Sequence, residues 1–250
     1  MIGIISAMKE EIQALLDHLK DKETIYKGKR TYFYGNLFDR KVVMVFSRWG
    51  KVASATTATQ LINDFDIKEI IFTGVAGSVQ EHINIGDIII GKNLYQYDMD
   101  ASPLIARFEI PLLKKTFFQT HLGKREILKI ASSHFISDFN NFIGKTEAQK
   151  FNIHLPKVHI EDIASGDQFI STSEQISTIK NNLPHVGCVE MEGAAVAQVC
   201  YEYGIPFSII RTISDKADDN SHIEFQVFAN EIASKYALGI LKKYFELVEV

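Results

Sequence analysis

The chain has 250 residues, of which 46% are hydrophobic, and a formal net charge of −4. This length fits one large domain with a substantial core. Its basic residues are scattered, which argues against nucleic acid or an anionic membrane as a partner. The two cysteines, Cys188 and Cys200, argue against a disulfide scaffold and favour a reducing compartment.

The N-terminus lacks the basic region of a signal peptide, and acidic residues follow its short apolar run at once. No stretch approaches the roughly 18 to 20 apolar residues that a membrane span needs. We therefore expect a cytoplasmic protein.

Runs rich in β-branched residues alternate with helical patterns along the chain. Strands are predicted at 2–6, 41–47, 69–77, 86–91, 159–170, 187–191 and 206–215. Helices are predicted at 9–21, 51–65, 124–139, 192–204 and 221–248. Near-continuous apolar strands are typical of sheets covered on both faces. The alternation predicts one α/β domain over 1–250, with a central, mostly parallel or mixed twisted sheet and helices on both faces.

The carboxyl ends of the predicted strands carry most of the chemistry-bearing side chains. In open α/β sheets, ligands bind beyond these ends. The first strand leads to Glu10 and Glu11, and the strand at 187–191 leads to Glu190 and Glu192. The last strand ends at Asp215. Three strand ends therefore supply carboxylates to one side of the sheet.

Each acid also has a structural interpretation. Glu10 and Glu11 could be first-turn acids favoured by the helix dipole. Glu190 and Glu192 could be one helix-start acid and one solvated acid, and Asp215 could be an N-cap. The glycines of "TGVAGS" fit neither a P-loop nor a dinucleotide fingerprint. The histidines and cysteines lack metal-ligand spacing, and no nucleophile elbow is present. We therefore expect no metal and no serine nucleophile.

Seven stretches together resemble one family: "IGIISAMKEEI", "GKVASATTAT", "TGVAGS", "NIGDIIIG", "IASGDQFIS", "VEMEGAAVAQVC" and "PFSIIRTISDKAD". They run from residue 2 to about 218 and are similar to the 5′-methylthioadenosine/S-adenosylhomocysteine nucleosidases, within the nucleoside phosphorylase superfamily. The resemblance implies a nucleoside phosphorylase-like fold, a small-molecule nucleoside substrate, no cofactor and a homodimer in which the neighbouring subunit closes the pocket.

The resemblance also implies residue roles. Cleavage of an adenine N-glycosidic bond needs an acid for the leaving base and a water for the sugar, as in glycoside hydrolysis. Asp215 matches the general acid at adenine N7, and burial in an apolar pocket should raise its pKa. Glu11 matches the residue that positions water, and Glu192 matches the one that binds the ribose hydroxyls.

The remaining matches concern substrate binding. Phe169 is expected to stack on adenine, the backbone of Ile170 to read the base edge, and Met191 to pack on the ribose. Ser214 and Arg211 match residues that support Asp215 and Glu192. The expected binding set is completed by Ala76 and Gly77.

The same resemblance favours hydrolysis over phosphorolysis. Related phosphorylases bind phosphate through an arginine where this chain has Phe72, and through another in the first loop, where this chain has Lys9, Glu10 and Glu11. A carboxylate there repels phosphate and suits water.

Several departures leave alternatives open. Val75 and Ser78 replace a usual serine and glycine, and "SRWGKV" introduces Arg48 and Trp49 near the expected ribose end. Segment 97–118 differs strongly from the family loop that encloses the 5′ substituent. A purine nucleoside phosphorylase, a futalosine-type nucleoside hydrolase and a non-catalytic nucleoside-binding protein remain alternatives.

Overall fold

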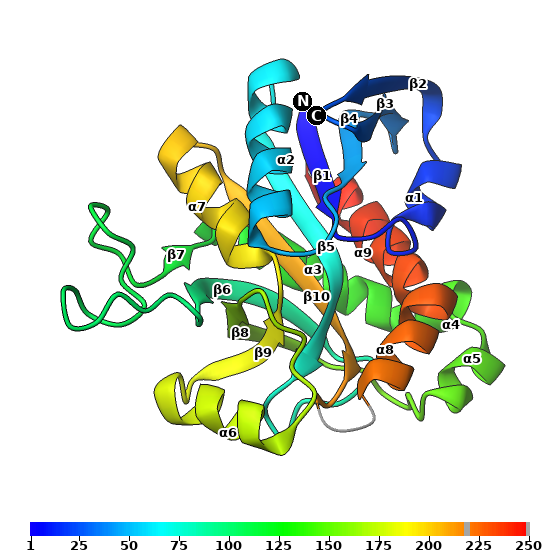
Figure 1. Cartoon of the computed structure of the whole chain (residues 1–250). Helices are drawn as coiled ribbons and strands as arrows, with labels where there is room; N and C mark the ends of the chain where they lie inside the picture. Colours follow the sequence, from blue (N-terminus) through cyan, green and yellow to red (C-terminus); the bar gives the residue numbers. More distant parts are fainter. Residues whose placement is uncertain (218–220, 249–250) are drawn as a thin grey trace.

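The computed structural model describes residues 1–217 and 221–248 (Figure 1). Its strands are β1 Ile2–Ser6, β2 Lys20–Lys27, β3 Arg30–Leu37, β4 Arg40–Phe46, β5 Glu69–Ser78, β6 Ile88–Gln96, β7 Phe118–Gln119, β8 Val158–Ser165, β9 Val186–Glu190 and β10 Phe207–Asp215. Its helices are α1 Gln13–Asp17, α2 Lys51–Asp64, α3 Leu122–Ser137, α4 Phe139–Phe142, α5 Lys145–Lys150, α6 Ser173–Asn182, α7 Gly193–Tyr203, α8 Ser221–Phe228 and α9 Ser234–Leu247. A π-helical turn, η1 Ala229–Ala233, joins α8 to α9.

The described strands form one mixed sheet, in the order β10-β6-β8-β9-β5-β1-β4-β3-β2, with β7 on β6. Strand β10 also pairs with β5, so the pairings β5–β10–β6–β8–β9–β5 close into a ring. Strands β1, β4, β5 and β10 run parallel, which brings their carboxyl ends to one side. The residues that follow these strands consequently converge.

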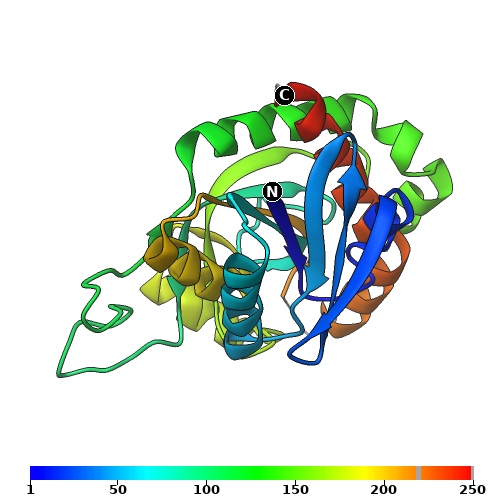
Figure 2. The same cartoon turned by 90° about the horizontal axis from the view of Figure 1, so that it is seen from above.

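Helices cover both faces of the sheet. Helices α2 and α7 pack together on one face, and α3 packs against α9 on another (Figures 1 and 2). Each pair covers its own cluster of buried apolar residues, with Leu61 and Val196 in one and Phe135 and Tyr236 in the other. The predicted α/β class, with a mixed sheet between helical layers, is confirmed. No helix in the described ranges is long and apolar enough to cross a membrane.

Several elements depart from the sequence prediction. The helix expected over 9–21 is only Gln13–Asp17, and the following hairpin β2–β3 had been missed. The helix α6 had also been missed, and the strand expected to reach residue 170 ends at Ser165. The single helix predicted at 221–248 is interrupted by η1. The hairpin was missed because β2, at the edge of the sheet, is mostly exposed and lacks the apolar run of a strand covered on both faces.

Segment 97–118 projects from the body of the molecule (Figures 1 and 2). It carries Leu104 and Leu112, which are 89% and 97% exposed. Apolar side chains so fully exposed on a long loop are typical of a contact surface.

Candidate functional site

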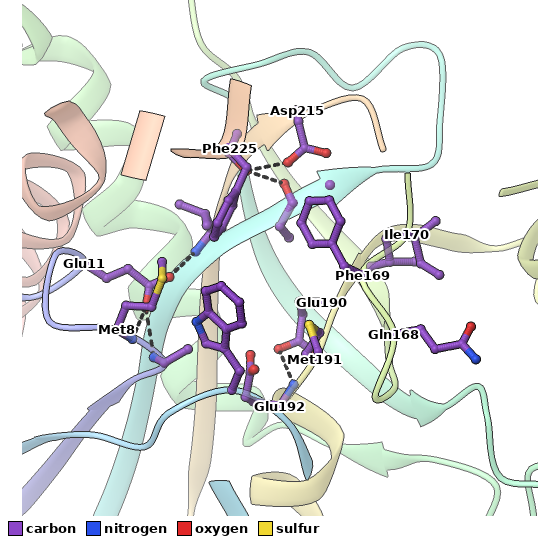
Figure 3. Close-up of a pocket in the computed structure, with 17 residues that line it drawn as sticks. Met8, Glu11, Gln168, Phe169, Ile170, Glu190, Met191, Glu192, Asp215 and Phe225 are labelled. Atoms are coloured by element: carbon purple, nitrogen blue, oxygen red, sulfur yellow. Dashed lines mark hydrogen bonds between the residues drawn. The ribbon is translucent and has the colours of Figure 1, made fainter. Parts of the chain in front are cut away.

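A pocket lies where β1, β5, β9 and β10 end (Figure 3). Nine of the ten predicted site residues line it: Glu11, Ala76, Gly77, Phe169, Ile170, Met191, Glu192, Ser214 and Asp215. Further lining residues are Ala7, Met8, Trp49, Val75, Gln168, Val189, Glu190 and Phe225. The tenth predicted residue, Arg211, is not part of the lining, and its side chain is buried among the carboxylates.

Glu11 is held by the backbone on two sides. One carboxylate oxygen accepts hydrogen bonds from the amides of Ala7 (2.8 Å) and Met8 (2.9 Å), and the other accepts one from Val75 (3.0 Å). The residue is only 2% exposed. Burial raises the pKa of Glu11, although the nearby Arg211 and the three amides act against this shift. Helix α1 begins after the turn that carries Glu11, at Gln13.

Arg211, on β10, is the cation of the site. Its Nη2 donates to Oε2 of Glu190 at 2.6 Å, and its guanidinium lies 4.1 Å from the centroid of the Phe72 ring. The other two guanidinium nitrogens, Nε and Nη1, are buried without a hydrogen-bond partner among the described residues. Arg211 donates its hydrogen bond to Glu190, and its charge also acts on Glu192, one of the two acids that Ser214 and Arg211 were together expected to support.

The sequence alone allows Glu190 to be either a helix-start acid or a solvated acid. In the structure its carboxylate accepts hydrogen bonds from the amides of Glu192 (3.2 Å) and Gly193 (2.8 Å) and from the hydroxyl of Ser165. It is 8% exposed. The sequence position of Glu190 could not show whether this acid stabilises a helix start or forms an ion pair, because its partner Arg211 lies 21 residues further along the chain.

Glu192 is the N-cap residue of α7 and accepts a hydrogen bond from the amide of Gly50 at 2.9 Å. Burial, reinforced by the negative charge of Glu190 and opposed by Arg211, raises the pKa of Glu192 to about 8. Three buried carboxylates, those of Glu11, Glu190 and Glu192, thus act electrostatically on one guanidinium. This part of the pocket favours an additional positive charge.

Asp215 lies across the pocket from the three glutamates (Figure 3). One oxygen accepts from the amide of Ala217 (2.8 Å), and the Ser214 hydroxyl lies 2.7 Å from the other. A Cβ on Gly77 would lie 2.8 Å from Asp215 Oδ1, so a larger residue there would displace this carboxyl group. Asp215 ends β10 and is not the N-cap of α8, which starts at Ser221.

Aromatic side chains form an apolar wall of the pocket. Phe169 meets Phe225 edge-on at 5.7 Å between centroids, and Trp49 meets Phe225 edge-on at 6.2 Å. Sequence reasoning missed Phe225, because an apolar residue in a helical pattern cannot be told from a core position. Trp49, which had been left open, lines the pocket.

Arg48 does not line this pocket. Its Nη2 donates to the carbonyl of Lys29, and it borders a neighbouring groove that shares Met8, Trp49 and Phe225 with the pocket. The residues that could hold a metal ion lie elsewhere: within the described ranges, ligand atoms of His82, His159 and Glu161 come within 4.8 Å of one another, and none of these residues lines the pocket.

Comparisons with known proteins agree with this geometry. The family model described as the phosphorylase superfamily matches residues 1–246. The 5′-methylthioadenosine/S-adenosylhomocysteine nucleosidase of Staphylococcus saprophyticus is 36% identical over 234 residues, which are 93% of this chain and 94% of that protein. The chain belongs to this nucleosidase family. The family resemblance predicted from the sequence is therefore confirmed.

Solved structures support the same assignment. The S-adenosylhomocysteine nucleosidase of Streptococcus pyogenes, bound to 5-methylthiotubericidin, matches this nucleosidase family member with a TM-score of 0.86 and 32% identity, covering 100% of this chain and 97% of that one. The futalosine hydrolase of Helicobacter pylori matches with a TM-score of 0.83 and 30% identity, over 99% and 97% of the two chains.

The raised pKa of Glu192 predicts a pH-dependent stability. Below the unfolded value of 4.5 both states are protonated, so the folded state keeps its full stability there. As pH rises from 4.5 through about 8, only the folded state still binds the proton, so the free energy of unfolding falls. Denaturant unfolding at several pH values should show this decline, and Glu192→Gln should flatten it. An equally steep decline in the variant would contradict the assignment.

Proposed function

We propose that this enzyme hydrolyses the N-glycosidic bond of 5′-methylthioadenosine and S-adenosylhomocysteine, releasing adenine and the thioribose. One observation carries the proposal: Glu11 and Glu192 line one side of a pocket whose opposite side carries Asp215 and an aromatic wall. A nucleoside whose base lies toward Asp215 and whose sugar lies toward the glutamates would meet both requirements of the reaction, a proton for the base and a water for the sugar.

Asp215 is proposed as the general acid that protonates adenine N7. The side chain is 3% exposed and its orientation is fixed through Ser214 and the amide of Ala217. Phe169 is proposed to stack on the base, and the backbone of Ile170 to read its edge. Ala76 and Gly77 line the floor on which the nucleoside would lie. Stacking and edge contacts would present N7 to the acid in a fixed geometry.

Glu11 is proposed to orient and activate the attacking water. Three backbone amides fix its carboxylate, so little reorganisation is needed at the moment of reaction. Glu192 is proposed to bind the ribose hydroxyls, with Met191 packed on the sugar. As positive charge develops on the ribosyl group, the ionised form of Glu192 becomes more favourable, so its interaction strengthens in the transition state.

Water is preferred over phosphate as the nucleophile in this proposal. Phe72 occupies the position of a phosphate-binding arginine and packs against Arg211 instead. Arg211 is paired with Glu190, and Arg48 donates to Lys29 outside the pocket. The described residues therefore leave no cation on the pocket lining that could hold phosphate.

A futalosine-type hydrolase is the second candidate. The likeness to the Helicobacter pylori futalosine hydrolase favours it, as does the open groove beside Trp49 and Phe225, which could take a larger 5′ group. Comparison of kcat/KM for methylthioadenosine, S-adenosylhomocysteine and futalosine decides between the candidates.

Incubation with methylthioadenosine, with and without phosphate, tests the reaction type. We expect free adenine and unphosphorylated methylthioribose at the same rate in both cases. Asp215→Asn keeps the shape but removes the acid, so turnover should fall by about 10²- to 10⁴-fold. The exposed Asp39→Asn serves as the matched control and should keep full activity.

Strict dependence on phosphate would contradict hydrolysis. A loss of less than about tenfold in Asp215→Asn would show that another group protonates the base. No turnover of any adenosine derivative would favour the non-catalytic binding protein.

We also propose a cytoplasmic homodimer in which segment 97–118 docks on the neighbouring subunit. Both free cysteines are buried, which fits a reducing compartment. Leu104 and Leu112 would be covered in the dimer, so Leu104→Asp combined with Leu112→Asp should convert it to a monomer. Light scattering after size-exclusion chromatography measures this, with Leu155→Asp as an exposed control outside the segment.

A monomeric wild-type protein at micromolar concentration would contradict the dimer. If the double variant and the control both remain dimeric, the interface lies elsewhere on the surface.

A further inference from the structure

A second cluster of chemically reactive side chains lies outside the pocket. His159 and Glu161 are two residues apart on β8, so their side chains leave the same face of the strand. His82 comes from the loop between β5 and β6. One ligand atom from each residue lies within 4.8 Å of the other two. The sequence predicts no metal site, because its histidines form neither an H-x-H nor an H-E-x-x-H pattern and its two cysteines are twelve residues apart.

The orientation of His159 is fixed by an acidic partner. Its Nε2 lies 2.9 Å from Oδ2 of Asp87, which leaves Nδ1 as the ring nitrogen without a described partner. The Asp87 carboxylate is itself held by the amides of Asn84 (3.0 Å) and Lys157 (2.8 Å). A histidine whose second nitrogen is bound to a carboxylate is the usual arrangement around metal-ligating histidines, since the carboxylate fixes the ring and raises its basicity.

The surrounding backbone also holds the ligands in place. The amide of Gly86 donates to the carbonyl of Ile213 (2.8 Å), and the amide of Ile213 donates to the carbonyl of Asp87 (2.9 Å). These two hydrogen bonds attach the loop before β6, which carries His82, to strand β10. On the other side, a Cβ on Gly187 would meet Glu161 at 2.7 Å, so the stem of Glu161 rests directly on that glycine. Hydrogen bonds and packing therefore fix the backbone segments that carry the three ligands.

We propose that His82, His159 and Glu161 form a binding site for a divalent first-row transition ion, of which Zn²⁺ is the representative. Two imidazoles and one carboxylate supply three protein ligands, and water would complete a tetrahedral set. Imidazole ligands favour zinc, copper or nickel over Mg²⁺, which prefers oxygen ligands. The exposed His82 gives the ion a path from solvent. A bound ion would cross-link β8 to the loop before β6.

Zinc binding to tag-free, chelator-treated protein tests the site. Titration calorimetry should give one Zn²⁺ per chain, and the melting temperature should rise to a plateau as Zn²⁺ is added. Mg²⁺ should do neither. His82→Ala and His159→Gln should each weaken zinc binding by at least about tenfold, because each removes one of three ligands. The exposed His154→Gln is the matched control and should bind as the wild type does.

The cobalt-substituted protein gives an independent readout. The visible absorption of Co²⁺ bound by nitrogen and oxygen ligands should appear in the wild type and in His154→Gln, and should be lost in His82→Ala. His82 is exposed, so this variant tests the site even if His159→Gln folds poorly. The proposal is overturned if the wild type binds no zinc at about 100 µM, or if His82→Ala binds it as tightly as the wild type does.

Discussion

The buried guanidinium of Arg211 is the interaction on which the site depends. It pairs with Glu190 and exerts its charge on Glu11 and Glu192, so one cation serves three buried carboxylates. Hydrogen bonds to backbone amides hold all three acids in place. Without the cation these groups would repel one another at close range. With only one cation, the pocket keeps an electrostatic preference for positive charge, which is what a ribosyl oxocarbenium centre supplies.

The position of Arg211 in the sheet places its guanidinium beside the acids of the pocket. Arg211 is carried by β10, which pairs with β5, and its guanidinium lies over Phe72 of β5. The parallel strands β1, β5 and β10 end on one side, so Glu11 and Asp215 reach the pocket from different strands. The edge hairpin β2–β3 and the terminal helix α9 lie outside the lining, and their sequences can vary without touching the acids.

The sequence predicted the buried parts well because burial on both faces leaves near-continuous apolar runs, as in β5 and β10. It failed for the hairpin β2–β3, whose exposed strand β2 lacks that pattern. Nine residues that the family resemblance implied line the pocket. The three carboxylates among them, Glu11, Glu192 and Asp215, follow strand ends, which meet at one side of an α/β sheet. The ion pair of Glu190 with Arg211 and the wall formed by Phe225 could not be predicted, since each depends on contacts between distant segments.

The free energy of unfolding of Arg211→Met tests the central claim most directly. If Arg211 is the cation that holds the buried acids, its loss leaves Glu190 uncompensated and should cost about 3–5 kcal/mol. The double variant Arg211→Met with Glu190→Met should recover part of that loss. An Arg211→Met protein as stable as the wild type, measured at neutral pH by denaturant unfolding, would contradict the account.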